Sequence, residues 1–166
     1  MKSTISKISS TMLLIIAFVM GGFTVSALGQ GQSDDNSIVG VWKTVVTPIN
    51  CQTGDPLSPT SFRGLLTFNS GGTMAEYGVN PFTPYRSPGH GLWTRKFNRR
   101  DYSFAFVFLR LNAAGGLLGT QEIRQISRLD RSGNVLNSTG SSQSFDLDGN
   151  VVGTGCARST ALRFVE

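Results

Sequence analysis

His90 is the one histidine of the chain, and it stands between two glycines, three residues before Trp93. Because imidazole titrates near neutral pH, His90 is a candidate acid or base, or a group that orients a polar ligand. Glu76 is the second candidate, since it shares a strand face with Met74 and a carboxylate on an apolar face needs a charged partner or a ligand. We expect that partner to be an arginine. An exposed histidine and a solvated carboxylate without a role are the alternative interpretation.

His90 and Glu76 are the only catalytic candidates in the sequence. No nucleophile motif and no second histidine accompanies them, so the pattern leaves open whether the protein is an enzyme. One histidine and two cysteines cannot assemble the usual three-ligand metal site. We therefore predict no metal and no other cofactor.

The two cysteines, Cys51 and Cys156, lie near the first predicted strand and in the last one. In an exported protein an isolated pair of cysteines favours a disulfide. A reactive thiol or a metal-binding pair is the alternative, although no further cysteine or histidine stands at ligand spacing from either residue. Because the first and last strands of a closed barrel are neighbours, this disulfide also favours closure.

Residues 1–27 have the pattern of a signal peptide. Lys2 and Lys7 flank a polar start, an apolar run follows at 12–23, and small residues predict cleavage after Ala27, with a second site at Gly29. The apolar run is too short to span a bilayer, and an uncleaved anchor is the alternative. We predict a secreted or periplasmic protein without a stable membrane span after processing. A flexible arm at 28–36 and one domain at 37–166 would follow the signal.

The basic charge of the chain is modest once the signal peptide is set aside. Lys2 and Lys7 supply two units of the formal net charge of +5, which leaves +3. The densest remaining basic group, at 95–100, brackets Asn98 at a predicted hairpin tip, where charges usually solvate a turn. We therefore predict no nucleic-acid partner. No pattern indicates the oligomeric state.

Segments rich in Val, Ile, Phe, Thr and Leu recur at intervals too short for long helices. They predict eight strands, at 38–47, 61–68, 73–79, 91–97, 102–111, 119–129, 135–147 and 151–165. Short connectors at 69–72, 98–101, 130–134 and 148–150 hold the glycine or asparagine that tight hairpin turns need. Strands joined in this way form a meander, and closure removes its two exposed edges. The predicted fold is an all-β, eight-stranded antiparallel up-and-down barrel.

Two connectors are longer, at 48–60 and 80–90. The second holds three prolines, which exclude regular helix and strand alike. Phe82 and Tyr85 give it side chains that can pack on the barrel. We predict a lid or rim loop here, and an ordinary ordered crossover is the alternative.

The segment at 102–108 alternates aromatic and smaller residues, which places its aromatic side chains on one strand face. An eight-stranded barrel encloses space for packed side chains or for one small ligand. These aromatic residues therefore either line an apolar cavity or fill a solid core. On the first interpretation the predicted ligand contacts are Phe62, Phe68, Glu76, His90, Tyr102, Phe104, Phe106 and Phe108.

Gly40-Val41-Trp42 places a glycine and a tryptophan two residues apart on the first predicted strand. Together with the signal peptide, the meander of eight strands and the predicted disulfide, this motif resembles the lipocalin and wider calycin group. The chain resembles bacterial exported lipocalin-like proteins of unknown function more than the hormone or pheromone carriers of the group. One departure is that lipocalins usually add a helix after the barrel, whereas this sequence ends at Glu166.

The resemblance implies that Trp42 closes the floor of the barrel and that an arginine of the last strand packs across it. Arg158 and Arg163 are the candidates. Arg158 is preferred, because it shares a strand face with Leu162 and Phe164.

The predicted function is the binding of a small apolar or amphipathic molecule by an exported barrel. Two alternatives remain open. The resemblance extends to barrel isomerases and cyclases that look like allene oxide cyclase, which act by folding an apolar substrate in a shaped pocket. A structural or interaction protein with a filled core is the other alternative.

Overall fold

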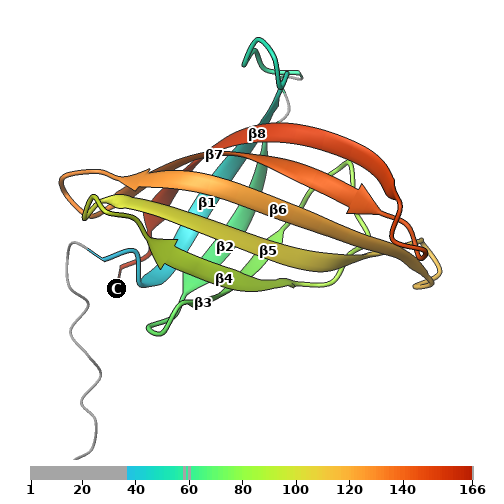
Figure 1. Cartoon of the computed structure of the whole chain (residues 1–166), viewed down its shortest axis with the longest axis horizontal. Helices are drawn as coiled ribbons and strands as arrows, with labels where there is room; N and C mark the ends of the chain where they lie inside the picture. The colour runs from blue at the N-terminus through green and yellow to red at the C-terminus, as the bar shows by residue number, and fades with distance from the viewer. Residues whose placement is uncertain (1–36, 58, 60, 166) are drawn as a thin grey trace, which may run out of the picture. The chain divides into compact units, whose positions relative to one another are not determined.

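The computed structural model describes residues 37–57, 59 and 61–165. In that part of the chain every regular element is a strand, and the eight strands close into one antiparallel barrel (Figure 1). The predicted signal peptide and N-terminal arm, at 1–36, lie outside the described residues. The strands are β1 (Gly40–Ile49), β2 (Phe62–Phe68), β3 (Thr73–Gly78), β4 (Gly89–Arg95), β5 (Asp101–Leu111), β6 (Leu117–Leu129), β7 (Val135–Phe145) and β8 (Val151–Arg163).

The strand order confirms the predicted up-and-down topology. Each strand pairs with the next along the chain, and β1 pairs with β8 to close the barrel. Trp42 is thereby opposite Leu66 on one side and Arg163 on the other. Closure leaves no unpaired sheet edge, which is the physical reason that a meander of this length forms a barrel.

Two of the hairpin turns repeat one arrangement of aspartate and glycine. Gly133 has φ of 76°, and the Asp130 carboxylate accepts hydrogen bonds from the Ser132 hydroxyl and the Val135 N–H. These bonds lower the pKa of Asp130 to about 2. Asp146 has an equivalent role in the β7–β8 turn. Because both turns are closed by their own side chains, they fix the register of β6 to β8.

Trp42 fills one end of the barrel, which we call the Trp42 end. Its side chain is 0% exposed, and its indole N–H donates a hydrogen bond of 2.8 Å to the carbonyl of Ile38. The buried side chains of Phe68, Tyr102 and Leu129 belong to the same apolar cluster. The predicted position of Trp42 at a barrel floor agrees with this packing.

Arg163 is the arginine that packs across the tryptophan. Its guanidinium lies 4.3 Å from the centre of the Trp42 ring and donates to the backbone carbonyls of Ser37, Val39 and Gly133. It therefore joins the segment before β1, the β6–β7 turn and the end of β8. A charged donor that makes several hydrogen bonds around an aromatic face is a strong local restraint.

The preference for Arg158 was wrong, because the side chains of β8 alternate with the opposite phase. Arg158 does share a face with Leu162, but that face is exposed to solvent, and Leu162 is 56% exposed. Ser159 and Ala161 are the buried residues of this strand. The inward face of β8 thus consists of the odd-numbered positions, which include Arg163.

The predicted disulfide between Cys51 and Cys156 is present. It links the connector after β1 to β8, two neighbouring parts of the closed barrel, and spans 105 residues of sequence. A native disulfide of this kind stabilises a fold by about 2 to 4 kcal/mol. It also indicates an oxidising compartment outside the cytoplasm. Within the described residues, no helix has the length and apolar character to cross a membrane.

Candidate ligand-binding cavity

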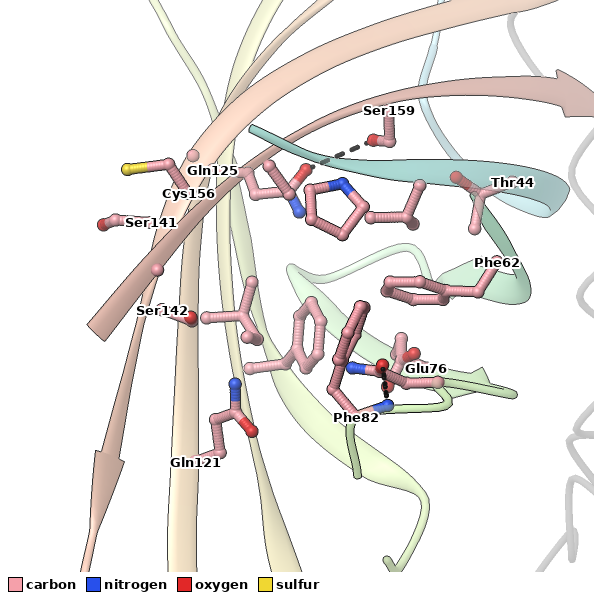
Figure 2. Close-up of a pocket in the computed structure, with 18 of the residues that line it drawn as sticks. Thr44, Phe62, Glu76, Phe82, Gln121, Gln125, Ser141, Ser142, Cys156 and Ser159 are labelled. Atoms are coloured by element: carbon pink, nitrogen blue, oxygen red, sulfur yellow. Dashed lines mark hydrogen bonds between the residues drawn. The ribbon is translucent and has the colours of Figure 1, made fainter. Parts of the chain in front are cut away.

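A cavity of about 380 Å³ occupies the barrel end opposite Trp42, which we call the cavity end. Its walls come from the inward faces of β1 to β3 and β5 to β8, and from both long connectors (Figure 2). Its volume lies in the range of sites that hold a small molecule. The barrel is therefore filled at the Trp42 end and hollow at the cavity end.

One wall of the cavity is aromatic. Phe104, Phe106 and Phe108 project from β5, and Phe62 and Leu66 project from β2. The rings of Phe104 and Phe106 stack with 6.5 Å between their centres and 13° between their planes. The three β5 side chains are buried, because alternate residues of this strand face inward.

The opposite wall is polar and is formed by β6 to β8. Gln121, Gln125, Ser142 and Ser159 project inward there, among glycines such as Gly140. Figure 2 shows Gln121 and Ser142 across the cavity from Phe62. A ligand in this space would contact apolar rings on one side and neutral hydrogen-bonding groups on the other.

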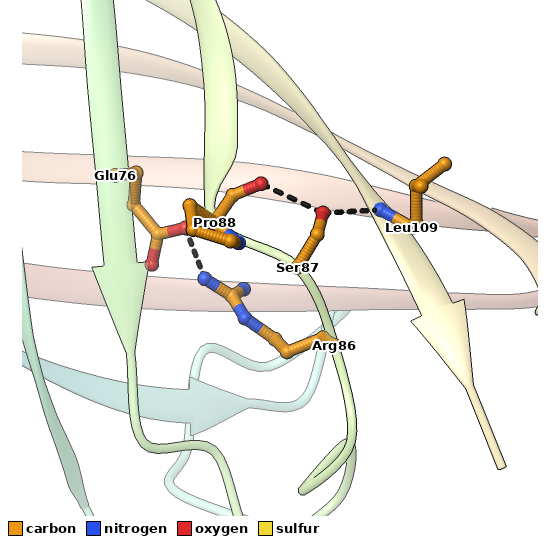
Figure 3. A network of polar contacts seen from close by, with 5 residues as sticks. All are labelled: Glu76, Arg86, Ser87, Pro88 and Leu109. Carbon is orange, nitrogen blue, oxygen red and sulfur yellow. Dashed lines mark hydrogen bonds and ion pairs between the residues drawn. The ribbon is translucent and has the colours of Figure 1, made fainter. Parts of the chain in front are cut away.

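A buried ion pair connects the aromatic wall to the proline-rich connector. Arg86, in the connector between β3 and β4, donates to the carboxylate of Glu76 on β3 (Figure 3). Their side chains are 6% and 8% exposed. The guanidinium also lies over the ring of Phe108, 3.9 Å from its centre. Arg86 is the arginine partner that the sequence led us to expect for Glu76.

Burial raises the pKa of Glu76, because the charged carboxylate loses water. The positive charge of Arg86 and its hydrogen bond act in the opposite direction. Desolvation is the larger effect, so the net direction is upward. Glu76 thus keeps its proton to a higher pH than an exposed glutamate.

The connector that carries Arg86 is anchored to the end of β5. The N–H of Ser87 donates to the carbonyl of Leu109 at 3.0 Å. The N–H of Leu109 donates to the Ser87 hydroxyl, also at 3.0 Å (Figure 3). The N–H of Leu111 donates to the carbonyl of Tyr85. Residues 85–88 are therefore an ordered crossover. Phe82 of the same connector lines the cavity and is 62% exposed.

Gly89 and Gly91, the two glycines beside His90, leave space for the Glu76 carboxylate, the Phe106 ring and the backbone of β5. A Cβ atom at Gly89 would lie 2.9 Å from the Glu76 carboxylate and 2.9 Å from the Phe106 ring. A Cβ atom at Gly91 would lie 1.9 Å from a backbone oxygen of β5. His90 itself is exposed on the outer face of β4 and does not line the cavity. This outward placement follows from the alternation of the strand, so His90 is not among the predicted ligand contacts that line this cavity.

Two further predicted ligand contacts also lie outside the cavity. Phe68 and Tyr102 are buried near the Trp42 end, where both pack edge-on or tilted against Trp93. Arg95 donates to the hydroxyl of Tyr102. These two residues face inward as predicted, but they stand too near the filled end. The predicted contacts that line the cavity are Phe62, Glu76, Phe104, Phe106 and Phe108.

Sequence reasoning did not identify the polar wall or Arg86. A signal was present in β6, where Gln121, Ile123, Gln125 and Ser127 occupy alternate positions of one strand face. Among the described residues, no group of three metal-binding side chains is placed to hold a metal ion.

A scan against models of protein families finds no match, and a search of curated proteins finds no similar sequence. The described structure thus establishes a closed barrel with an internal cavity. Any functional assignment depends on the chemistry of that cavity.

Proposed function

We propose that this protein binds a small apolar or amphipathic molecule, without covalent chemistry, in the cavity opposite Trp42. The observation that carries the proposal is the cavity itself, with about 380 Å³ of space beside an aromatic wall. A closed barrel holds these walls in place before a ligand arrives, which lowers the entropic cost of binding. The filled-core alternative is disfavoured by the same volume.

The arrangement at the Trp42 end supports a lipocalin-like protein. Trp42 on the first strand is buried under Arg163 of the last strand, and the strands follow one another around the barrel. These features match what the resemblance implies for the group. The lipocalin-like assignment is part of the proposal.

Export is the second part of the proposal. The signal-peptide pattern at 1–27 and the Cys51–Cys156 disulfide both support a secreted or periplasmic protein. An exported carrier or scavenger would meet its ligand outside the cytoplasm.

One observation favours a barrel isomerase or cyclase as the second candidate. Glu76 is a carboxyl group with a raised pKa on the cavity wall, which suits proton transfer to or from a bound substrate. Incubation of an identified ligand with the protein distinguishes the candidates. A new product whose formation ceases in Glu76→Gln, while binding persists, would assign the enzyme.

Native mass spectrometry of the protein purified from its own host tests the binding proposal. The expected spectrum contains the protein with one small molecule bound, because the aromatic wall retains an apolar ligand through purification. A known barrel–ligand complex in the same buffer is the control for gentle ionisation. Only bare protein, under conditions that preserve the control complex, would contradict the proposal.

A further inference from the structure

The two walls of the cavity present different chemical groups to a ligand. The aromatic side chains of β2 and β5 offer flat apolar surface, whereas Gln121 and Ser142 offer amide and hydroxyl groups from the opposite side (Figure 2). A purely apolar molecule would cover the polar wall without replacing its hydrogen bonds to water. The arrangement therefore suits a molecule with an apolar face and a polar edge.

Three buried polar atoms at this site lack a hydrogen-bond partner among the described residues. They are the Thr44 hydroxyl, the Gln121 side-chain carbonyl and Nε of Arg86, and all three side chains line the cavity. Leaving such atoms unpaired in a dry site is unfavourable. A ligand hydroxyl both donates and accepts, so this one kind of group is able to serve the amide oxygen and the guanidinium alike.

The charges in the cavity are already balanced. Of the described residues that line it, Glu76 and Arg86 alone are charged, and they form an ion pair with each other. A ligand carboxylate would enter beside the carboxylate of Glu76 and find its cation already bound. Burial of an uncompensated charge is strongly unfavourable.

We propose that the cavity selects an uncharged ring compound with hydroxyl groups along one edge, such as a phenol or a polyhydroxylated ring system, and discriminates against carboxylates such as fatty acids. This inference rests on the proposed binding function and specifies the class of ligand. The Glu76–Arg86 pair is the element that excludes the anions. Gln121 is the element that prefers a hydroxyl over a bare ring.

Three probes of one ring system test the inference at neutral pH: naphthalene, 2-naphthol and the anion 2-naphthoate. We expect the wild-type protein to bind 2-naphthol about tenfold more tightly than 2-naphthoate, and more tightly than naphthalene. Affinity is measured from the change in probe fluorescence on titration. Equal or tighter binding of 2-naphthoate to the wild-type protein would overturn the inference without any variant.

Glu76→Gln tests the role of the ion pair. The variant leaves the positive charge of Arg86 without its carboxylate, so the preference for 2-naphthol over 2-naphthoate should fall by about tenfold. Glu122→Gln changes the same group at an exposed site whose nearest cation is also exposed, and it should keep the wild-type preference. Retention of the full preference in a folded Glu76→Gln protein, as judged by near-ultraviolet circular dichroism, would overturn the assigned role.

Gln121→Leu tests the role of the polar wall. The variant should lose most of the preference for 2-naphthol over naphthalene, because the amide that pairs with the hydroxyl is gone and only Nε of Arg86 and the Thr44 hydroxyl remain as partners. Gln143→Leu, on the outward face of β7, is the matched control and should keep the difference. Binding of naphthalene without discrimination among the three probes would overturn this inference and leave the binding function standing. Failure of all three probes to bind would contradict the proposed function itself.

Discussion

Trp42→Ala is expected to lower the free energy of unfolding by about 3 to 5 kcal/mol. The indole is fully buried, and its loss would remove the ring that Arg163 packs against and the hydrogen bond to Ile38. A cavity would remain at the Trp42 end, where neighbouring strands cannot collapse without breaking their ladders. Equilibrium unfolding in urea, followed by far-ultraviolet circular dichroism, measures the change.

Leu92→Ala is the control for this variant. Leu92 is 64% exposed on the outer face of β4, so its truncation should change stability by no more than about 0.5 kcal/mol. A loss below about 1 kcal/mol for Trp42→Ala would show that the indole does not close the barrel.

Arg86→Met is expected to cost about 3 to 5 kcal/mol of stability at neutral pH. Methionine keeps apolar contact with the ring of Phe108, but it leaves the Glu76 carboxylate buried without its cation. This loss of stability is electrostatic in origin, whereas truncation of an apolar residue acts through lost packing. It should therefore depend on pH.

The direction of that dependence follows from the pKa of Glu76, which is raised above its ordinary value of 4.5. The native state binds this proton more tightly than the unfolded state, so the contribution of Glu76 to stability is fully present below pH 4.5 and falls as the pH rises through the native pKa. Arg86→Met removes the influence that lowers the pKa. The stability lost by this variant should be small near pH 4 and should grow toward pH 7. Urea unfolding curves recorded at intervals of about one pH unit measure this change.

A double variant, Glu76→Gln with Arg86→Met, is the control. Removing both charges should recover most of the stability lost by Arg86→Met alone, because no buried charge then lacks a partner. Equal losses in the single variant near pH 4 and pH 7, or a double variant no more stable than the single one, would contradict the electrostatic account of this pair.

Much of the fold was predictable because its signals are local. The alternation within a strand and the turn residues between strands can each be recognised within a few consecutive residues. Each predicted strand end lies within two residues of the observed one. The phase of β8 was not predictable in this way. Leu162 and Phe164 are apolar yet exposed, whereas Ser159 is buried, so hydrophobicity alone assigns the wrong face.

The candidate site was predictable only where one strand carries the pattern. Alternation within β5 alone places its aromatic residues on one face. Glu76 lies two residues from Met74 on β3, so the apolar neighbour on the same face predicts that Glu76 is buried. Arg86 reaches Glu76 because Ser87 anchors the connector to Leu109 of β5, and this contact depends on the folded chain. The polar wall needs the alignment of three strands before its glutamines and serines can be seen to meet.

The sequence pattern also does not show how far each inward-facing residue lies from the barrel floor. Phe68 and Tyr102 have the inward orientation expected of cavity residues, but they lie at the level of Trp93, near the filled end. Alternation reports which face a side chain takes and carries no information on its depth along the barrel.

Ala157→Phe tests most directly whether the cavity is a binding site. Ala157 faces the cavity from β8, so a phenylalanine there would occupy the space that a ligand needs, while Leu162→Phe adds a ring on the exposed face of the same strand. Titration with the neutral fluorescent probe N-phenyl-1-naphthylamine measures occupancy. We predict saturable binding of one probe by the wild-type and Leu162→Phe proteins, and binding about tenfold weaker or absent in Ala157→Phe. Equally tight binding by Ala157→Phe and the wild-type protein would contradict the assignment of this cavity.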